Sequence, residues 1–423
     1  MTRDTLCAGL RSFLSARVVR GAVAGAVGVG AAALVACTPP AGRSATPRPD
    51  TASTAGAEGG PKRGLRMNEI QAVGSHNSYK RAIPAVELAL LRERSPEGAL
   101  ALDYGHVSLT EQLERGLRQL ELDVYRDPVG GRYADPLLPR LASGLPGAEP
   151  YDPREMDAPG YKVMHLQDVD VRTSCKSFVA CLREIRAWSD ANPRHVPILI
   201  LINAKDAPID QPGAVAPLPF DAAAFDALDG ELLSGFERSR IVAPDDVRRD
   251  AATLRDGATT DGWPLLDDAR GKLVFTLDED PAIVEIYARG RGSLEGLPMF
   301  VNAVSERADH AAYVTLNDPV GGAQRIRDAV RAGLLVRTRA DADTREARTG
   351  DTRRRDAALA SGAQYVSTDY YLPRADLGPY RVALPDGTTE RCNPILHDTS
   401  CTLSESSSAA PRAIRSRGAP GEP

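Results

Sequence analysis

The stretch AVGSHNSYK at residues 72–80 is the part of this 423-residue chain from which the fold can be predicted. An apolar run, Ile70–Val73, predicts a buried strand that ends at Gly74, where the backbone can turn sharply. His76 and Asn77 then place an imidazole beside an amide oxygen. At the C-terminal end of a parallel strand, such a pair faces the active-site mouth of an α/β barrel. Alone, a His-Asn pair is more typical of a capped turn with a structural histidine. Whether it belongs to an active site therefore depends on whether later strands also end in polar residues.

Seven further apolar runs follow at intervals expected for strands that alternate with helices. The predicted strands are 70–73, 119–125, 161–166, 196–202, 272–277, 299–304, 334–338 and 364–368. Helical spacing after Ser177, and helices that end at Gly333 and Gly362, fill several intervals. The pattern predicts an α/β fold, a TIM-type (β/α)8 barrel, over residues 66–402. An open doubly wound sheet is the alternative, although no Gly-rich phosphate loop follows the first strand.

Two segments rich in Pro and Gly are predicted to be insertions in this barrel. Residues 126–160 follow the second predicted strand, and residues 206–219 follow the fourth. Long loops on the C-terminal face of a barrel commonly shape a binding cleft, so we expect both insertions to border the site.

Oxygen ligands for a metal ion are predicted at the ends of the first, second and fourth strands. Glu121 and Asp123 are two residues apart on an otherwise apolar strand, so both carboxylates point to the same side. Burial of unpaired charge is costly, which makes a shared cation a reason for their presence. Asn77 and Asn203 add amide oxygens at the same edge. An all-oxygen site favours Ca²⁺, with Mg²⁺ as the less favoured ion, over zinc.

Acid–base and phosphate-binding groups are predicted at the remaining strand ends. His165 ends the third predicted strand, and two histidines across a barrel mouth can divide base and acid work near neutral pH. Lys205 and Arg339 follow the fourth and seventh strands, where they could bind a phosphate. Tyr370, after the eighth strand, could stack on a ring or a lipid headgroup. A solvated salt bridge is the alternative for each of these strand-end residues, and it is the preferred interpretation for Asp341, Asp343 and Tyr371.

The remaining histidines are predicted to be structural or surface residues: His106, His195, His310 and His397.

The ends of the chain predict export. Residues 1–36 combine arginines with an apolar run that is too short and too rich in Gly and Ala for a convincing membrane span. The run ends in LVAC at residues 34–37, which resembles a bacterial lipoprotein signal with Cys37 as the lipidated residue; an ordinary secretory signal is the alternative. Both predict a cell-surface, secreted or periplasmic protein. Residues 37–65 are predicted to be a flexible linker and residues 403–423 a disordered tail.

Charge and cysteine content narrow the possible partners. Without residues 1–36, the chain keeps 48 basic and 56 acidic residues and has no Lys/Arg block, which excludes nucleic acid as an expected partner. Four cysteines remain after Cys37, and four cysteines allow three connectivities. Cys175–Cys181 and Cys392–Cys401 are the simplest pairing, and such short loops would act as local staples.

The ordered strand-end motifs resemble the calcium-dependent phosphatidylinositol-specific phospholipase C family, in its bacterial and fungal single-barrel branch. The resemblance is carried by GSHNSY, ELDVY, HLQDVD, NAKD, RTRAD and STDYY and covers about residues 66–402. It implies that His76 and His165 are catalytic and that Asn77, Glu121 and Asp123 bind calcium. In eukaryotic relatives a glutamate ends the fourth strand, whereas this chain has Asn203, with Asp206 nearby.

The resemblance also implies a reaction and a substrate. We expect a monomeric single barrel that acts on phospholipid at a membrane or micelle surface, with diacylglycerol and a cyclic inositol phosphate as products. A glycerophosphodiester phosphodiesterase or a sphingomyelinase-D-like enzyme on the same fold is the alternative, but its first motif usually reads His-Arg-Gly, where this chain has His-Asn-Ser. A non-catalytic surface lipoprotein that binds a lipid or sugar headgroup is a more remote alternative, since binding alone does not require two titrating histidines.

Overall fold

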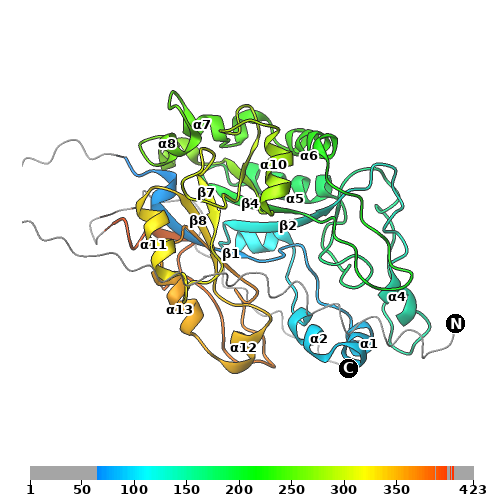
Figure 1. Cartoon of the computed structure of the whole chain (residues 1–423). Helices are drawn as coiled ribbons and strands as arrows, with labels where there is room; N and C mark the ends of the chain where they lie inside the picture. Colours follow the sequence, from blue (N-terminus) through cyan, green and yellow to red (C-terminus); the bar gives the residue numbers. More distant parts are fainter. Residues whose placement is uncertain (1–63, 386, 398–400, 402, 404–423) are drawn as a thin grey trace, which may run out of the picture.

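The protein is described by a computed structural model over residues 64–385, 387–397, 401 and 403, which Figure 1 shows as a strand core with helices around it. The predicted signal peptide 1–36, the lipidation site Cys37, nearly all of the linker 37–65 and the tail beyond residue 403 lie outside the described residues.

Eight parallel strands form a nearly closed barrel, which confirms the predicted fold class. Their order around the barrel is β6-β5-β4-β2-β1-β9-β8-β7, and every hydrogen-bonded neighbour in this order is parallel. A single parallel bridge between Asn302 and Tyr313 joins β6 to β7 and closes the ring. The strands are β1 (Ile70–Ser75), β2 (Gln119–Tyr125), β4 (Ile198–Ala204), β5 (Leu273–Leu277), β6 (Met299–Val301), β7 (Tyr313–Thr315), β8 (Leu335–Arg339) and β9 (Tyr365–Thr368).

The predicted third strand, 161–166, is wrong as a barrel strand. Only β3 (Lys162–Val163) forms there, and it pairs antiparallel with Val124 and Tyr125 at the end of β2. The chain then turns, because the amides of His165 and Leu166 both donate to the carbonyl oxygen of Asp170. The third barrel strand is instead β4. The eighth strand is β7, a three-residue element inside the short apolar run AAYVTL at residues 311–316, which the sequence analysis did not assign as a strand.

Most helices lie around the strands, and three of them, α1, α2 and α4, lie to one side (Figure 1). The predicted helices around residues 178–188, 324–332 and 353–360 are confirmed, and Gly333 and Gly362 adopt the left-handed conformation that ends two of them. The helices are α1 (Ala85–Arg94), α2 (Pro96–Leu102), α3 (Leu109–Glu114), α4 (Leu137–Ala142), α5 (Phe178–Ala191), α6 (Ala222–Gly235), α7 (Pro244–Arg248), α8 (Leu254–Ala258), α9 (Leu266–Ala269), α10 (Pro281–Ala288), α11 (Ala323–Arg331), α12 (Arg345–Thr349) and α13 (Arg353–Ala360). Short 3-10 turns at Met67–Glu69 and Arg238–Arg240 and the strand β10 (Glu390–Cys392), antiparallel to β1, complete the described elements.

The alternation of side chains along β2 explains how the barrel carries polar groups at its mouth. Leu120, Leu122 and Val124 belong to the main hydrophobic core. Glu121 and Asp123 point the other way, since side chains alternate along a strand. Burial of the apolar set therefore forces both carboxylates to the opposite, inner side of the strand.

One buried carboxylate, Asp168, fastens both insertions to the turn that follows β3. Its Oδ1 accepts the amide of Leu137 in the first insertion at 2.9 Å, and its Oδ2 accepts the amide of Val215 in the second at 2.6 Å. The prediction that residues 126–160 and 206–219 loop out after barrel strands is confirmed, and both lie against the segment that carries His165.

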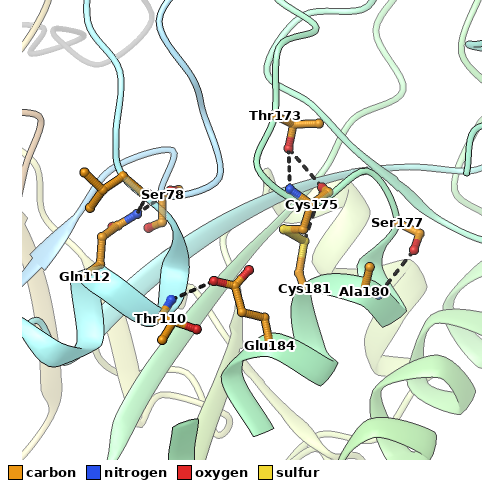
Figure 2. Close-up of a disulfide and its surroundings, with 10 residues drawn as sticks. Ser78, Thr110, Gln112, Thr173, Cys175, Ser177, Ala180, Cys181 and Glu184 are labelled. Carbon is orange, nitrogen blue, oxygen red and sulfur yellow. Dashed lines mark hydrogen bonds between the residues drawn. A yellow bond between two sulfur atoms is a disulfide. The ribbon is translucent and has the colours of Figure 1, made fainter. Parts of the chain in front are cut away.

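Both predicted disulfides are present, Cys175–Cys181 and Cys392–Cys401. Figure 2 shows the first one, which ties the segment before α5 to the first turn of that helix, where Ser177 caps the amide of Ala180. Within the described part of the chain, no helix is both long enough and apolar enough to cross a bilayer.

Candidate active site

The turn after β1 presents His76 at the mouth of the barrel. Asn77 adopts the left-handed conformation with φ of 47°, which turns the chain away from the strand directly after the histidine. Helix α3 supports this turn through Gln112, whose Nε2 donates to the carbonyl oxygen of Ser78 at 2.7 Å (Figure 2). Glu184 of α5 in turn accepts the amide of Thr110 at the start of α3. The histidine therefore stands on a rigid turn rather than on a free loop.

The imidazole of His76 is held between a carboxylate and a guanidinium. Its Nδ1 lies 2.8 Å from Oδ1 of Asp369, and its Nε2 lies 3.3 Å from Nη1 of Arg339 and 3.7 Å from Oε1 of Glu121. Burial and the nearby Arg339 lower the pKa of His76 well below its ordinary value. The ring is thus neutral at neutral pH; with Nδ1–H directed at Asp369, Nε2 carries a lone pair that can accept a proton.

The second histidine, His165, lies in the turn after β3 and is supported in the same way. Its Nδ1 is 2.8 Å from Oδ2 of Asp170, and the hydroxyl of Tyr125 donates to its backbone carbonyl oxygen at 3.1 Å. The side chains of both His76 and His165 remain 17% exposed. His165 also contributes to the lowered pKa of His76, so the two imidazoles lie in one electrostatic environment. The structure brings together the two predicted catalytic histidines, each with its own aspartate.

The two carboxylates of β2 converge on the side chain of Asn203. The amide Nδ2 of Asn203 donates to Oε1 of Glu121 at 3.2 Å and to Oδ1 of Asp123 at 3.0 Å. Each carboxylate also has a cationic partner: Arg337 lies 2.6 Å from Glu121, and Lys205 lies 2.9 Å from Asp123. Four charged side chains and one amide therefore form a balanced network on the inner face of the barrel.

The chemistry of these donors fits a calcium ion. Two carboxylates reach the same atom of Asn203, and a flip of that amide would place an oxygen at the same point. Within the described part of the chain, the side-chain oxygen of Asn77 accepts a single long hydrogen bond, from the hydroxyl of Tyr79 at 3.4 Å. The described residues contain no group of three or more His, Cys, Asp or Glu side chains arranged for a metal, so any ion here depends on amide ligands as well as on Glu121 and Asp123.

The three predicted substrate-binding residues occupy different environments. Arg339 and Lys205 lie at the mouth, beside His76 and Asp123 respectively. Tyr370 is instead buried at 3% exposure, with its ring packed edge-on against Tyr380 in an apolar cluster. In this position the ring of Tyr370 packs in the protein interior, and the structure does not support its predicted stacking on a substrate.

Residues that the sequence analysis left without a role complete the site. Asp369 and Asp170 support the histidines, and Arg337 neutralises Glu121. The signal for each aspartate was available: Asp369 directly follows a strand, and Asp170 ends the HLQDVD motif. Half-buried Glu279, whose Oε1 accepts the amide of Ala204 at 2.6 Å, lies two residues after the end of β5, and the sequence analysis gave it no role. Burial raises the pKa of Glu279 to about 8.

Comparison with protein families gives a match over residues 65–394, to the family described as phosphoinositide phospholipase C, Ca2+-dependent. The chain belongs to this family. The phospholipase C family thus covers the whole barrel and both insertions, which confirms the resemblance inferred from the strand-end motifs. None of the curated proteins compared with the chain matches it.

Solved structures that resemble the chain include calcium-dependent phosphoinositol-specific phospholipase C from the Gram-negative bacterium Pseudomonas sp., in an apo form, at 16% identity. That match covers 78% of this chain and 95% of the other, with a TM-score of 0.46. A Ca²⁺-dependent phosphatidylinositol-specific phospholipase C from Streptomyces antibioticus matches at 18% identity, over 73% of this chain and 95% of the other, with a TM-score of 0.45.

Proposed function

We propose that this protein cleaves phosphatidylinositol-type phospholipids, releasing diacylglycerol and an inositol phosphate that is cyclic when first formed. The observation that carries the proposal is the pairing of each histidine with its own aspartate, His76 with Asp369 and His165 with Asp170, at one barrel mouth. Membership in the phospholipase C family supports the phosphodiester bond as the target.

The two histidines divide the proton transfers of this reaction. His76 accepts the proton of the inositol 2-hydroxyl at Nε2, and the hydroxyl oxygen attacks phosphorus. His165 donates a proton from Nε2 to the diacylglycerol oxygen as its bond to phosphorus breaks. Asp369 and Asp170 keep each ring in the tautomer that its role requires and stabilise the cationic form. Hydrolysis of the cyclic product uses the same groups with reversed roles.

Positive side chains bind the phosphate during these steps. Arg339 presents its guanidinium beside Nε2 of His76, and the ammonium of Lys205 lies beside Asp123. Both can donate to the nonbridging oxygens of the phosphodiester. Asn77, Glu121, Asp123 and Asn203 are the residues that would hold Ca²⁺, which when bound polarises the phosphate and lowers the pKa of the attacking hydroxyl.

Cleavage of phosphatidylinositol in the presence and absence of EDTA tests this proposal. We expect ³¹P NMR to detect a 1,2-cyclic inositol phosphate, with activity restored by Ca²⁺ better than by Mg²⁺. His76→Ala and His165→Ala are each expected to reduce the rate by about 100-fold or more. Release of choline or glycerol phosphate from sphingomyelin or glycerophosphodiesters would instead establish the alternative class of barrel enzyme.

We also propose that the protein acts outside the cytoplasm as a monomer at a phospholipid surface, anchored through Cys37. The LVAC sequence at residues 34–37 supports the anchor, and two disulfides are typical of an oxidising compartment. Metabolic labelling with palmitate in the bacterial host tests it: the wild-type chain is expected to take up label, and a Cys37→Ala variant is expected to take up none.

A further inference from the structure

The last residue of the AVGSHNSYK stretch, Lys80, is fully buried and has no part in the proton transfers proposed above. Its ammonium donates to the carbonyl oxygens of Tyr104 at 2.7 Å and of Leu102 at 3.0 Å. The same nitrogen lies 3.4 Å from Oδ2 of Asp170, whose side chain is also fully buried. A buried ammonium is costly to maintain, so its position beside Asp170 needs an explanation.

Asp170 shares one oxygen between Lys80 and the second histidine. Its Oδ2 is 2.8 Å from Nδ1 of His165 and 3.4 Å from Nζ of Lys80. Its Oδ1 has no hydrogen-bond partner among the described residues. A buried carboxylate with so few partners is costly unless a neighbouring positive charge pairs with it, and that pairing also fixes the orientation of the carboxylate. Lys80 is that charge.

The backbone around Lys80 joins the segments of the two histidines. Residue 80 forms an antiparallel bridge with Thr173, in the segment that follows His165. The Lys80 ammonium also lies 4.5 Å from the ring centre of Tyr104, whose hydroxyl accepts the side-chain amide of Asn77 at 2.8 Å. The lysine therefore contacts Asp170 directly on the His165 side of the site and reaches Asn77 on the His76 side through Tyr104.

We propose that Lys80 is a positioning residue for His165, which it serves by holding the carboxylate of Asp170 in its orientation against Nδ1 of the imidazole. The inference rests on the proposed function, in which His165 protonates the departing diacylglycerol oxygen. Without Lys80, the carboxylate of Asp170 can rotate, and His165 loses the partner that directs Nε2–H at the leaving group.

Two substrates with different leaving groups test this role. Short-chain phosphatidylinositol releases an alkoxide that must be protonated, whereas 4-nitrophenyl inositol 1-phosphate releases a stable phenolate. For His165→Ala we expect a loss of kcat of about 100-fold on the lipid and of less than about 10-fold on the aryl ester. Lys80→Met is expected to show the same selectivity, with a loss of at least about 10-fold on the lipid, little change on the aryl ester and no change in KM for either.

Lys162 provides a matched control. It is also fully buried, its ammonium contacts the carbonyl oxygens of Ala158 and Gly160, and it lies 3.7 Å from Asp127. Among the described residues, no hydrogen bond or ion pair joins its side chain to His76 or His165. Lys162→Met should lower the melting temperature as Lys80→Met does, with equal effects on the two substrates. Equal losses on both substrates for Lys80→Met would overturn the inference.

A second variant keeps the inference testable if Lys80→Met does not fold. Asp170→Asn preserves the shape of the side chain and removes the charge that Lys80 holds, so it must show the same leaving-group selectivity. An unchanged ratio of the two rates in Asp170→Asn overturns the inference. If the wild type cleaves neither substrate, the proposed function itself fails. If the wild type and His165→Ala behave as expected but Lys80→Met and Asp170→Asn show no selectivity, only the role of Lys80 fails.

Discussion

The imidazole Nδ1 of His76 lies 2.8 Å from Oδ1 of Asp369, which joins the first barrel strand to the last. Asp369 is the residue directly after β9, and its other oxygen lies 3.1 Å from Arg339. Closure of the barrel is what brings these side chains together, because 293 positions separate the histidine from its aspartate along the chain.

Asp369→Asn is expected to reduce kcat by about 100-fold or more while KM stays within about twofold. The amide can donate to Nδ1 of His76, which would stabilise the tautomer with its proton on Nε2 and remove the base. Steady-state kinetics on phosphatidylinositol measures the effect. Asp376→Asn, at an exposed aspartate that pairs with Arg374, is the control and should retain wild-type kcat.

Acid destabilisation is predicted from His195, a buried histidine outside the site. It contacts the hydroxyl of Ser189 and the carbonyl oxygen of Val196, and burial lowers its pKa from 6.5 to about 4. Below pH 6.5 the unfolded chain therefore binds a proton that the folded chain rejects. This histidine alone should lower the free energy of unfolding by about 1.4 kcal/mol per pH unit between pH 6.5 and 4.

Urea unfolding of the wild type and of His195→Gln across this range measures that contribution. The variant should show a shallower decline of stability from pH 6.5 to 4, and the two curves should run parallel above pH 7.5. Identical slopes in the acid range would contradict the assignment.

Calcium affinity is predicted to be limited by Asn203 and Lys205. The carboxylates of Glu121 and Asp123 are already balanced by two cations, and the neutral Asn203 adds no charge of its own. Asn203→Glu should therefore raise the affinity for Ca²⁺ by about tenfold, since affinity follows the charge of the ligands. Isothermal titration calorimetry measures it directly. Asn192→Asp, at the end of α5, is the control and should leave the affinity unchanged.

The two disulfides are expected to differ in their effect on activity. Each closes a short loop, so replacing either pair with serine should cost about 2 kcal/mol of stability. Cys175 and Cys181 also tie the segment after His165 to α5, which supports the turn of His76 through α3 (Figure 2). Loss of this pair should lower kcat several-fold, whereas loss of Cys392–Cys401 should not. Equal activities in the two double variants, at matched stability, would disprove the difference.

The sequence was most informative where a buried strand ends in polar residues. His76, Asn77, Glu121 and Asp123 follow or interrupt strongly apolar runs, so alternation and burial predict their position. His165 lies in a turn and not at the end of the predicted barrel strand, because the apolar run around it forms only a two-residue strand before the chain turns. Contacts such as His76–Asp369 and Arg337–Glu121 could not be predicted, since each depends on which strands are neighbours in the closed barrel.

Strand length explains the other error in the fold. The strand β7 has only three residues, Tyr313–Thr315, and its pairing with β6 is a single bridge. A run this short has no distinctive period, and the barrel supplies the neighbours that make it a strand. The burial of Tyr370 could not be predicted for a similar reason. Its position after a strand end suggested a side chain that contacts the substrate, whereas its ring packs in an apolar cluster formed by segments distant in the sequence.

The attachment of Leu137 and Val215 to the single carboxylate of Asp168 has a consequence for engineering and for divergence. Replacing either insertion by a loop from another barrel would remove one of the two backbone hydrogen bonds to Asp168, which lies in the same turn as His165. The two loops are therefore expected to be inherited, and successfully transplanted, only as a pair together with the turn between them.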